Sequence, residues 1–160
     1  MIRYLNVMAG LAMKIFMAFG LSSVGVPGWA ASWQWAKGVN SPSIDQLEHQ
    51  VGKSIDRDAF GNVYITGSVS GNTMFSDDVS VKADAQSRDF FLAKYDADGN
   101  ALWAFRGGSP THGDEEGLAV RCFRGDVYVT GYVSGSGTLE ASNGAFAYQA
   151  KGQRDVLIAK

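Results

Sequence analysis

An internal repeat constrains the fold of this chain more than any other feature. The stretch GNVYITGSVSG at residues 61–71 returns as GDVYVTGYVSG at residues 125–135, with identical residues at eight of the eleven positions. Three neighbouring segments recur in the same order: 33–42 as 101–110, 52–55 as 117–120, and 88–94 as 154–160. A period of this size indicates one supersecondary unit used twice. The offset varies between 64 and 68 residues, which places insertions in the connections.

Both copies have the composition of β-strands. The segments NVYITGSV and DVYVTGYV are rich in the Val, Ile, Tyr and Thr residues that suit a pleated surface. FFLAKY and VLIAK are almost wholly apolar, which predicts strands buried on both faces. DAFGN and DADGN, which lie between such runs, predict hairpin turns. A further strand is predicted at residues 73–81, with a weaker counterpart at 145–150, and no helical period is found after residue 30.

These patterns predict an all-β fold of tandem four-stranded antiparallel blades, as in a β-propeller, with about two repeats and an incomplete ring. The first blade spans residues 31–100, and the second, truncated blade spans residues 101–160. Alternation along a strand places Tyr64 toward one adjoining blade and Val63 and Ile65 toward the other. A two-layer sandwich would need alternating strands rather than a run such as FFLA.

The strings GNVYITG, DFFLAKYDADGNALWA and GDVYVTG resemble the bacterial extracellular β-propeller repeat family, often called seven-bladed propeller repeats. The resemblance covers residues 33–160. It implies secretion or surface display and no catalytic residues. A closed propeller has about four to eight blades, so two blades leave open faces for self-association. Two explanations remain open: a truncated fragment or split reading frame, and a short chain that completes its ring by oligomerising.

Residues 1–30 are predicted to be a secretory signal peptide. They hold two basic residues and no acidic one, an apolar run follows Lys14, and Gly28 and Ala30 place small residues before a cut after Ala30. An uncleaved membrane anchor is the alternative, because residues 7–26 approach the length of a membrane span. Cleavage predicts a secreted, cell-surface or periplasmic protein with no stable membrane insertion.

The charge balance argues against nucleic acid as a partner. Without Arg3 and Lys14 the chain holds 12 basic and 16 acidic residues, and no Lys/Arg cluster is present to follow a phosphate backbone. Cys122 is the only cysteine, so a disulfide within the chain is excluded. We expect Cys122 to be a small buried hydrophobe, and a disulfide to another molecule is the alternative.

The densest polar cluster is THGDEEG at residues 111–117, and the linker of the first copy carries related residues. The candidates for cation binding or acid–base chemistry are His112, Asp114, Glu115 and Glu116 in the second copy and Asp45, Glu48 and His49 in the first. Polar linkers that merely face water are the favoured interpretation, because the spacing matches no zinc pattern. DADGN at residues 96–100 resembles part of a calcium loop but lacks the Gly and Glu that complete one, so a turn is predicted.

Five aromatic residues are candidates for stacking on a sugar, although their alternation along strands favours inter-blade core: Tyr64, Phe90, Phe91, Tyr95 and Trp103. The sequence contains no nucleophile–base motif and no phosphate-binding loop. No catalytic, metal or cofactor site is therefore predicted, and no ligand-binding residue is assigned. The expected function is an exported non-enzymatic repeat protein that binds a protein or glycan or serves as a scaffold. The alternative is a fragment of a propeller lyase or hydrolase whose active site lies in missing blades.

Overall fold

The computed structural model describes residues 32–42, 49–110 and 113–160. The chain divides into two units, Met1–Trp33 and Gln34–Lys160, and the second unit contains all eleven described strands. The predicted signal peptide, residues 1–30, lies outside the described residues. In the described part of the chain, no helix is long and apolar enough to cross a membrane.

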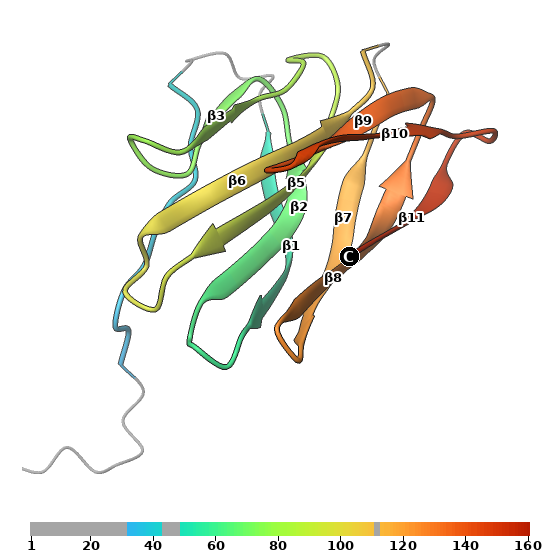
Figure 1. The fold of residues 1–160 in the computed structure, drawn as a ribbon. Coiled ribbons are helices and arrows are strands. Elements are labelled where there is room, and N and C mark those ends of the chain that lie inside the picture. The colour runs from blue at the N-terminus through green and yellow to red at the C-terminus, as the bar shows by residue number, and fades with distance from the viewer. Residues whose placement is uncertain (1–31, 43–48, 111–112) are drawn as a thin grey trace, which may run out of the picture. The chain divides into compact units, whose positions relative to one another are not determined.

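The all-β prediction is confirmed, because the strands form antiparallel sheets of six, three and two strands (Figure 1). The six-stranded sheet has the order β1 (Gln50–Arg57), β2 (Val63–Val69), β5 (Asp89–Tyr95), β6 (Ala101–Gly108), β9 (Ser136–Ala141), β10 (Gly144–Gln149). The three-stranded sheet has the order β11 (Asp155–Ala159), β8 (Asp126–Val133), β7 (Glu116–Phe123). The remaining hairpin pairs β3 (Asn72–Met74) with β4 (Ser80–Lys82).

The two copies of the repeat are built on the same three-stranded motif. In the first copy β2 lies between β1 and β5, and in the second copy β8 lies between β7 and β11. Each copy has a β-bulge at the same place, between Gly52 and Ser54 in the first and between Gly117 and Ala119 in the second. The repeated sequence therefore encodes a repeated strand arrangement, including its irregularity.

The prediction of four-stranded blades is met only in part. The segment 73–81 forms the short hairpin β3–β4, and the strand beside β2 is β1, a segment for which the sequence patterns predicted no strand. β1 is a half-exposed edge strand, so its residues are mostly polar and carry little strand signal. The second copy keeps three strands in its own sheet because its hairpin β9–β10 joins β6. Within the described residues, the sheets form no closed ring and no propeller arrangement.

Two hydrophobic clusters lie on opposite faces of the six-stranded sheet. One lies toward the hairpin β3–β4, and Val63 and Ile65 pack against its buried residues, which include Val69, Phe75, Val81, Phe91 and Tyr95. The other lies between the six- and three-stranded sheets and contains Tyr64, Phe90, Val120, Val129, Val133 and Leu157. Tyr64 and Ile65 therefore face opposite ways, as alternation along a strand predicts. β5 contributes to both clusters, which confirms burial of FFLAKY on both faces.

The DADGN segment is a hairpin turn, as predicted. Asp96 Oδ1 accepts hydrogen bonds from the backbone N–H groups of Asp98 and Asn100 at 3.0 and 2.8 Å. Hydrogen bonds from the side chain and backbone of Asn100 lower the pKa of Asp96. Gly99 has a φ angle of 82°, a conformation that glycine adopts without a steric penalty. DAFGN forms the same kind of turn around the carboxylate of Asp58.

Candidate functional site

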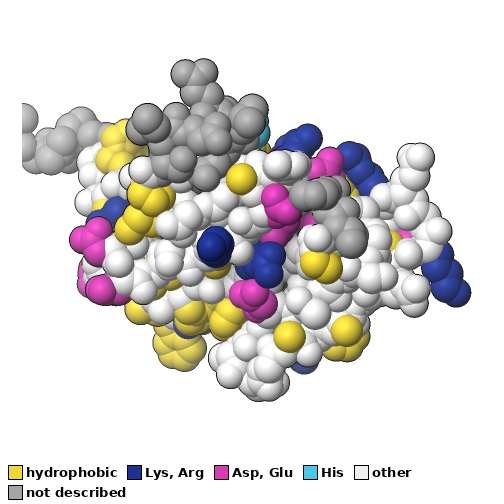
Figure 2. Space-filling model, turned by 90° about the horizontal axis from the view of Figure 1, so that it is seen from above, with side chains coloured by type: hydrophobic (Ala, Val, Ile, Leu, Met, Phe, Trp, Pro, Cys, Tyr) yellow, Lys and Arg dark blue, Asp and Glu magenta, His cyan; other side chains and the backbone are white. Residues whose placement is uncertain are grey.

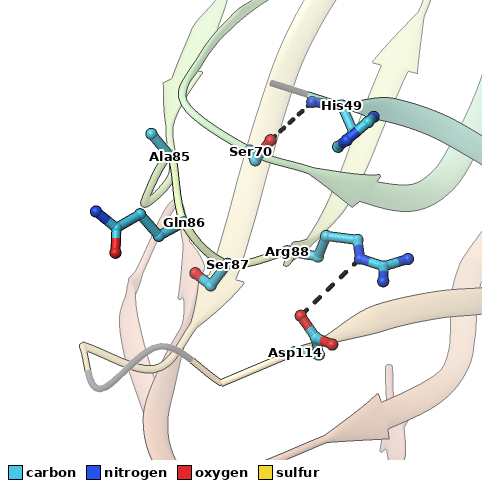
Figure 3. A pocket seen from close by; sticks show the side chains of 7 residues that line it. All are labelled: His49, Ser70, Ala85, Gln86, Ser87, Arg88 and Asp114. Atoms are coloured by element: carbon cyan, nitrogen blue, oxygen red, sulfur yellow. Dashed lines mark hydrogen bonds and ion pairs between the residues drawn. The ribbon is translucent and has the colours of Figure 1, made fainter. Parts of the chain in front are cut away.

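A cleft of about 390 Å³ is lined by residues that directly precede β1, β5 and β7 and by one that follows β2 (Figure 3). Its lining residues are His49, Ser70, Ala85, Gln86, Ser87, Arg88 and Asp114. The cleft brings together one member of each polar cluster predicted from the sequence, His49 and Asp114. Asp45, Glu48 and His112, which belong to the same clusters, lie outside the described residues.

Local backbone contacts place the side chains around the cleft. The backbone N–H of His49 donates to Ser70 Oγ at 2.7 Å, and the N–H of Ser70 donates to the carbonyl of His49 at 3.0 Å. Asp114 forms an isolated parallel bridge with Arg88, and its backbone N–H donates to Ser134 Oγ at 2.8 Å. The segments that follow β2 and β8 are thus tied to the segments that precede β1, β5 and β7.

Asp114 lies between two arginines at this cleft. Arg88 Nε lies 3.9 Å from Asp114 Oδ1, and Arg154 Nη2 lies 3.9 Å from Asp114 Oδ2. Figure 3 shows the side chains of Arg88 and Asp114 pointing toward one another. All three side chains are well exposed, so each ion pair contributes at most about 1 kcal/mol to stability. Their charged groups therefore remain accessible to a polar ligand.

The other two acidic residues of THGDEEG are buried. Glu115 is fully buried, and its Oε1 accepts hydrogen bonds from the backbone N–H and the hydroxyl of Ser134 at 3.3 and 3.2 Å. Burial raises the pKa of Glu115. Glu116 Oε1 accepts a hydrogen bond from the hydroxyl of Ser68 at 3.2 Å and lies 3.3 Å from Lys53 Nζ. The predicted cluster is therefore divided, with Asp114 in the cleft and the two glutamates in structural positions.

A buried ion pair beside the cleft could not be inferred from the sequence. Asp89 is fully buried, and Arg106 contacts its carboxylate closely while lying 3.2 Å from Glu140 Oε1. Ser87, which lines the cleft, donates to Asp89 Oδ1 at 3.2 Å. Burial raises the pKa of Asp89, and the neighbouring guanidinium opposes that rise. The repeat gives no signal for this pair, because Gly38 occupies the position of Arg106 in the first copy.

The cleft offers polar groups that could contact a ligand. Among the described residues, no three His, Cys, Asp or Glu side chains are grouped so that they could hold a metal ion. The Ser70 hydroxyl is bound by the backbone of His49, which ties two segments together and does not activate a nucleophile. Arg88 and Gln86 offer hydrogen-bond donors and Asp114 offers an acceptor, which together can recognise a polar ligand.

The aromatic residues considered for sugar stacking are core residues. The exposed fractions of Tyr64, Phe90, Phe91 and Tyr95 are 6%, 5%, 3% and 2%. Trp103 packs edge-on against Tyr64, with ring centroids 6.0 Å apart. A sugar platform needs an open ring face, so the prediction that these residues form core is confirmed.

Cys122 is partly buried and packs against the cluster between the two larger sheets. Burial raises the pKa of its thiol, which lowers the thiolate fraction and hence the reactivity of the side chain. These observations agree with the expected role of a small hydrophobe.

Lys and Arg side chains are interspersed with Asp and Glu side chains over the described part of the face in Figure 2. On the described part of this face, such mixing provides no continuous basic track for a phosphate backbone. Comparisons with models of protein families, with curated proteins and with solved structures find no match to this chain.

Proposed function

We propose that this chain is an exported, non-enzymatic β-propeller repeat protein that binds a polar ligand such as a glycan at the cleft of His49, Arg88 and Asp114. In this proposal β6, which begins the second copy of the repeat in the sequence, completes the blade of β1, β2 and β5, and β7, β8 and β11 belong to the next blade. The observation that carries the proposal is the use of several described acidic residues, whose side chains hold strands or copies together.

Three carboxylates illustrate this use. Asp56 Oδ2 accepts a hydrogen bond from the backbone N–H of Cys122 at 2.7 Å and so links the two copies. Glu116 links them through Ser68, and Asp89 pairs with an arginine in the interior. A general acid or base must reach the proton that it transfers, and these groups already have protein partners.

The contact between the two larger sheets supports the assignment of blades. A propeller blade must be covered on its faces by neighbouring blades. Tyr64 and Phe90 of the six-stranded sheet belong to one apolar cluster with Val120 and Leu157 of the three-stranded sheet. The same strand motif occurs on both sides of this cluster, as expected for consecutive blades.

A printed glycan array tests the proposed function with the full chain. We expect saturable binding to a class of polar glycans, weakened about tenfold or more by Arg88→Ala because the guanidinium lines the cleft. Arg124→Ala is the matched control, since this exposed arginine lies in the turn between β7 and β8. Mass spectrometry of the recovered glycans should find them intact. Shortened or unsaturated glycans would contradict a non-enzymatic function. Equal loss of binding in Arg88→Ala and Arg124→Ala would contradict the cleft as the binding site.

A further inference from the structure

The contact between the two copies shows how one copy covers the next. We call this contact the internal joint; it consists of the apolar cluster around Val120, which is 0% exposed, and the strands β1 and β7. The backbone N–H of Val120 donates to Ser54 Oγ at 3.1 Å. A Cβ added to Gly117 would lie 1.9 Å from Thr66 Oγ1, so this part of β7 must be glycine to approach the first copy.

The far side of the three-stranded sheet carries the repeat-equivalents of residues that form the internal joint. No other strand of the described chain covers this side, and Lys160 Nζ lies 5.6 Å from the centroid of the Tyr128 ring. We call it the open face; it consists of Tyr128, Val156 and Ile158, which are 38%, 76% and 80% exposed. Their counterparts in the first copy are Tyr64, Phe90 and Leu92, which all contribute to the internal joint. Valine and isoleucine at such exposure leave an apolar surface that association would bury.

The opposite end of the unit carries the complementary surface. Ile55 on β1 is the counterpart of Val120 and is 61% exposed. Gly52 is the counterpart of Gly117, yet a Cβ added at Gly52 would meet only Ile65, at an ordinary distance of 3.8 Å. The contacts of Gly52 within its own chain therefore do not require glycine at this position. A second chain packed on β1 as the first copy packs on β7 would require it.

The strand edges are complementary as well. β11 is an edge strand, although its counterpart β5 is paired with β6. The segment Gln34–Asn40 repeats Leu102–Gly108 of β6. It already occupies the corresponding place, because Asn40 bridges Met74 as Gly108 bridges Thr138. Trp35 fixes the segment by donating from Nε1 to the carbonyl of Ala97 at 3.0 Å.

We propose that copies of this chain associate head to tail, with the open face and β11 of one copy docking on β1 and Gln34–Asn40 of the next. The segment Gln34–Asn40 then pairs with the neighbour's β11 as β6 pairs with β5. Transfer of the β5–β6 register sets Lys37 opposite Ile158, since Phe105 lies opposite Leu92. A second copy is the occupant that fits, because the chain itself carries both halves of the contact in repeat-equivalent positions.

The contact between copies differs from the internal joint in one respect. Ala119 and Arg121 occupy the positions of Ser54 and Asp56, whose side chains bind backbone N–H groups of β7. These two hydrogen bonds are not reproduced, so we expect association to be reversible and dependent on concentration. A head-to-tail contact closes into a ring or extends into a filament, depending on the rotation between copies.

Sedimentation velocity of the full chain at increasing concentration tests the proposal. We expect the wild type to form multimers and Gly52→Ala to associate about tenfold or more weakly, because its Cβ would meet the neighbour's counterpart of Thr66. Gly38→Ala is the matched control and should associate like the wild type, since the larger Arg106 occupies the equivalent position where β6 pairs with β5. Ile158→Lys places a charge on the open face and should also abolish association. Circular dichroism should show both disrupting variants folded.

Disulfide cross-linking tests the proposed register between Gln34–Asn40 of one copy and β11 of its neighbour. In a Cys122→Ser background, Lys37→Cys combined with Ile158→Cys should give a ladder of disulfide-linked multimers, because residues directly opposite on paired strands lie within disulfide reach. Ile158→Cys combined with Ser142→Cys should not give a ladder. A monomeric wild type at all concentrations, association that survives Gly52→Ala and Ile158→Lys, or a ladder only from the control pair would overturn the proposal. The inference rests on neither export nor glycan binding, so its failure and theirs are distinguishable.

Discussion

Single residues explain why the opening phrase of the repeat is preserved. Gly67 and Gly131 lie opposite the two β-bulges, and a Cβ on either would come within 1.9 Å of a carbonyl oxygen, that of Val51 or Glu116. The threonine before each glycine donates a hydrogen bond from its hydroxyl to a backbone carbonyl of the paired strand. Thr66 donates to Phe91 on β5 at 2.7 Å, and Thr130 donates to Leu157 on β11 at 2.9 Å. The Thr-Gly dipeptide is thus required by the local backbone, and its recurrence needs no ligand to explain it.

Glu115 gives the protein a pH-dependent stability. Because burial raises its folded-state pKa above the ordinary value of 4.5, the folded protein binds this proton more tightly than the unfolded chain does. The free energy of unfolding therefore falls as the pH rises from the ordinary pKa through the raised one. Glu115→Gln keeps an acceptor for Ser134 without the charge, so we expect a smaller loss of stability over this pH range.

Urea denaturation of Glu115→Gln and the wild type at several pH values between about 4 and 8 measures this difference. Asp77→Asn, which removes an exposed carboxylate from the surface, controls for a change in net charge. If the free energy of unfolding depends on pH in the same way for Glu115→Gln and the wild type, the buried carboxyl does not contribute to that pH dependence.

At the scale of strands, β7 is the element that joins the copies. It pairs with β8 within its own sheet and lies against β1 and β2 of the other. Side chains from β1 bind two of its backbone N–H groups, and the side chain of Glu116 at its start reaches Ser68 on β2. An edge strand usually exposes its backbone groups to solvent or to other chains. Here the preceding copy provides partners for two of them.

Substitutions at repeat-equivalent positions test this role of β7. Val120→Ala removes buried methyl groups and should lower the free energy of unfolding by about 2 kcal/mol. Ile55→Ala at the equivalent, 61% exposed position of β1 should cost less than about 1 kcal/mol in dilute solution. Chemical denaturation gives both values. Equal costs would show that the two positions are buried alike, contrary to the structure.

For the whole molecule, the N-terminal residues predict where the protein is located. A basic start, an apolar middle and small residues before Ala31 predict removal of residues 1–30 during export. Expressed in full in a bacterial host, the chain should appear outside the cytoplasm with Ala31 as its first residue. Intact-mass spectrometry checks this result, and Ala30→Leu should block the cut because it removes the small residue. Full-length wild-type chain retained in the membrane fraction would favour the alternative that residues 1–30 remain as an uncleaved membrane anchor.

Strand periodicity and turn chemistry made much of the fold predictable. Tyr64 and Ile65 face opposite ways because neighbouring residues of a strand alternate between its two faces. The turn at Asp96 likewise depends on residues adjacent in sequence. β1 and β7 escaped prediction, and for β1 the reason is that a polar edge strand has no apolar pattern. At the cleft, His49 and Asp114 were identifiable as polar linker residues. Their proximity was not, because it depends on how the two copies pack.

The sequence by itself determined the repeat, the all-β class and the positions of the turns. These follow from local strand and turn preferences that occur in both copies of the repeat. Only the tertiary structure decided which acidic residues of THGDEEG are buried, that Asp89 meets Arg106, and that β9–β10 extends the sheet of the other copy. It also showed that Val156 is exposed where its counterpart Phe90 is covered. These features depend on contacts between residues far apart in the chain, which local preferences do not encode.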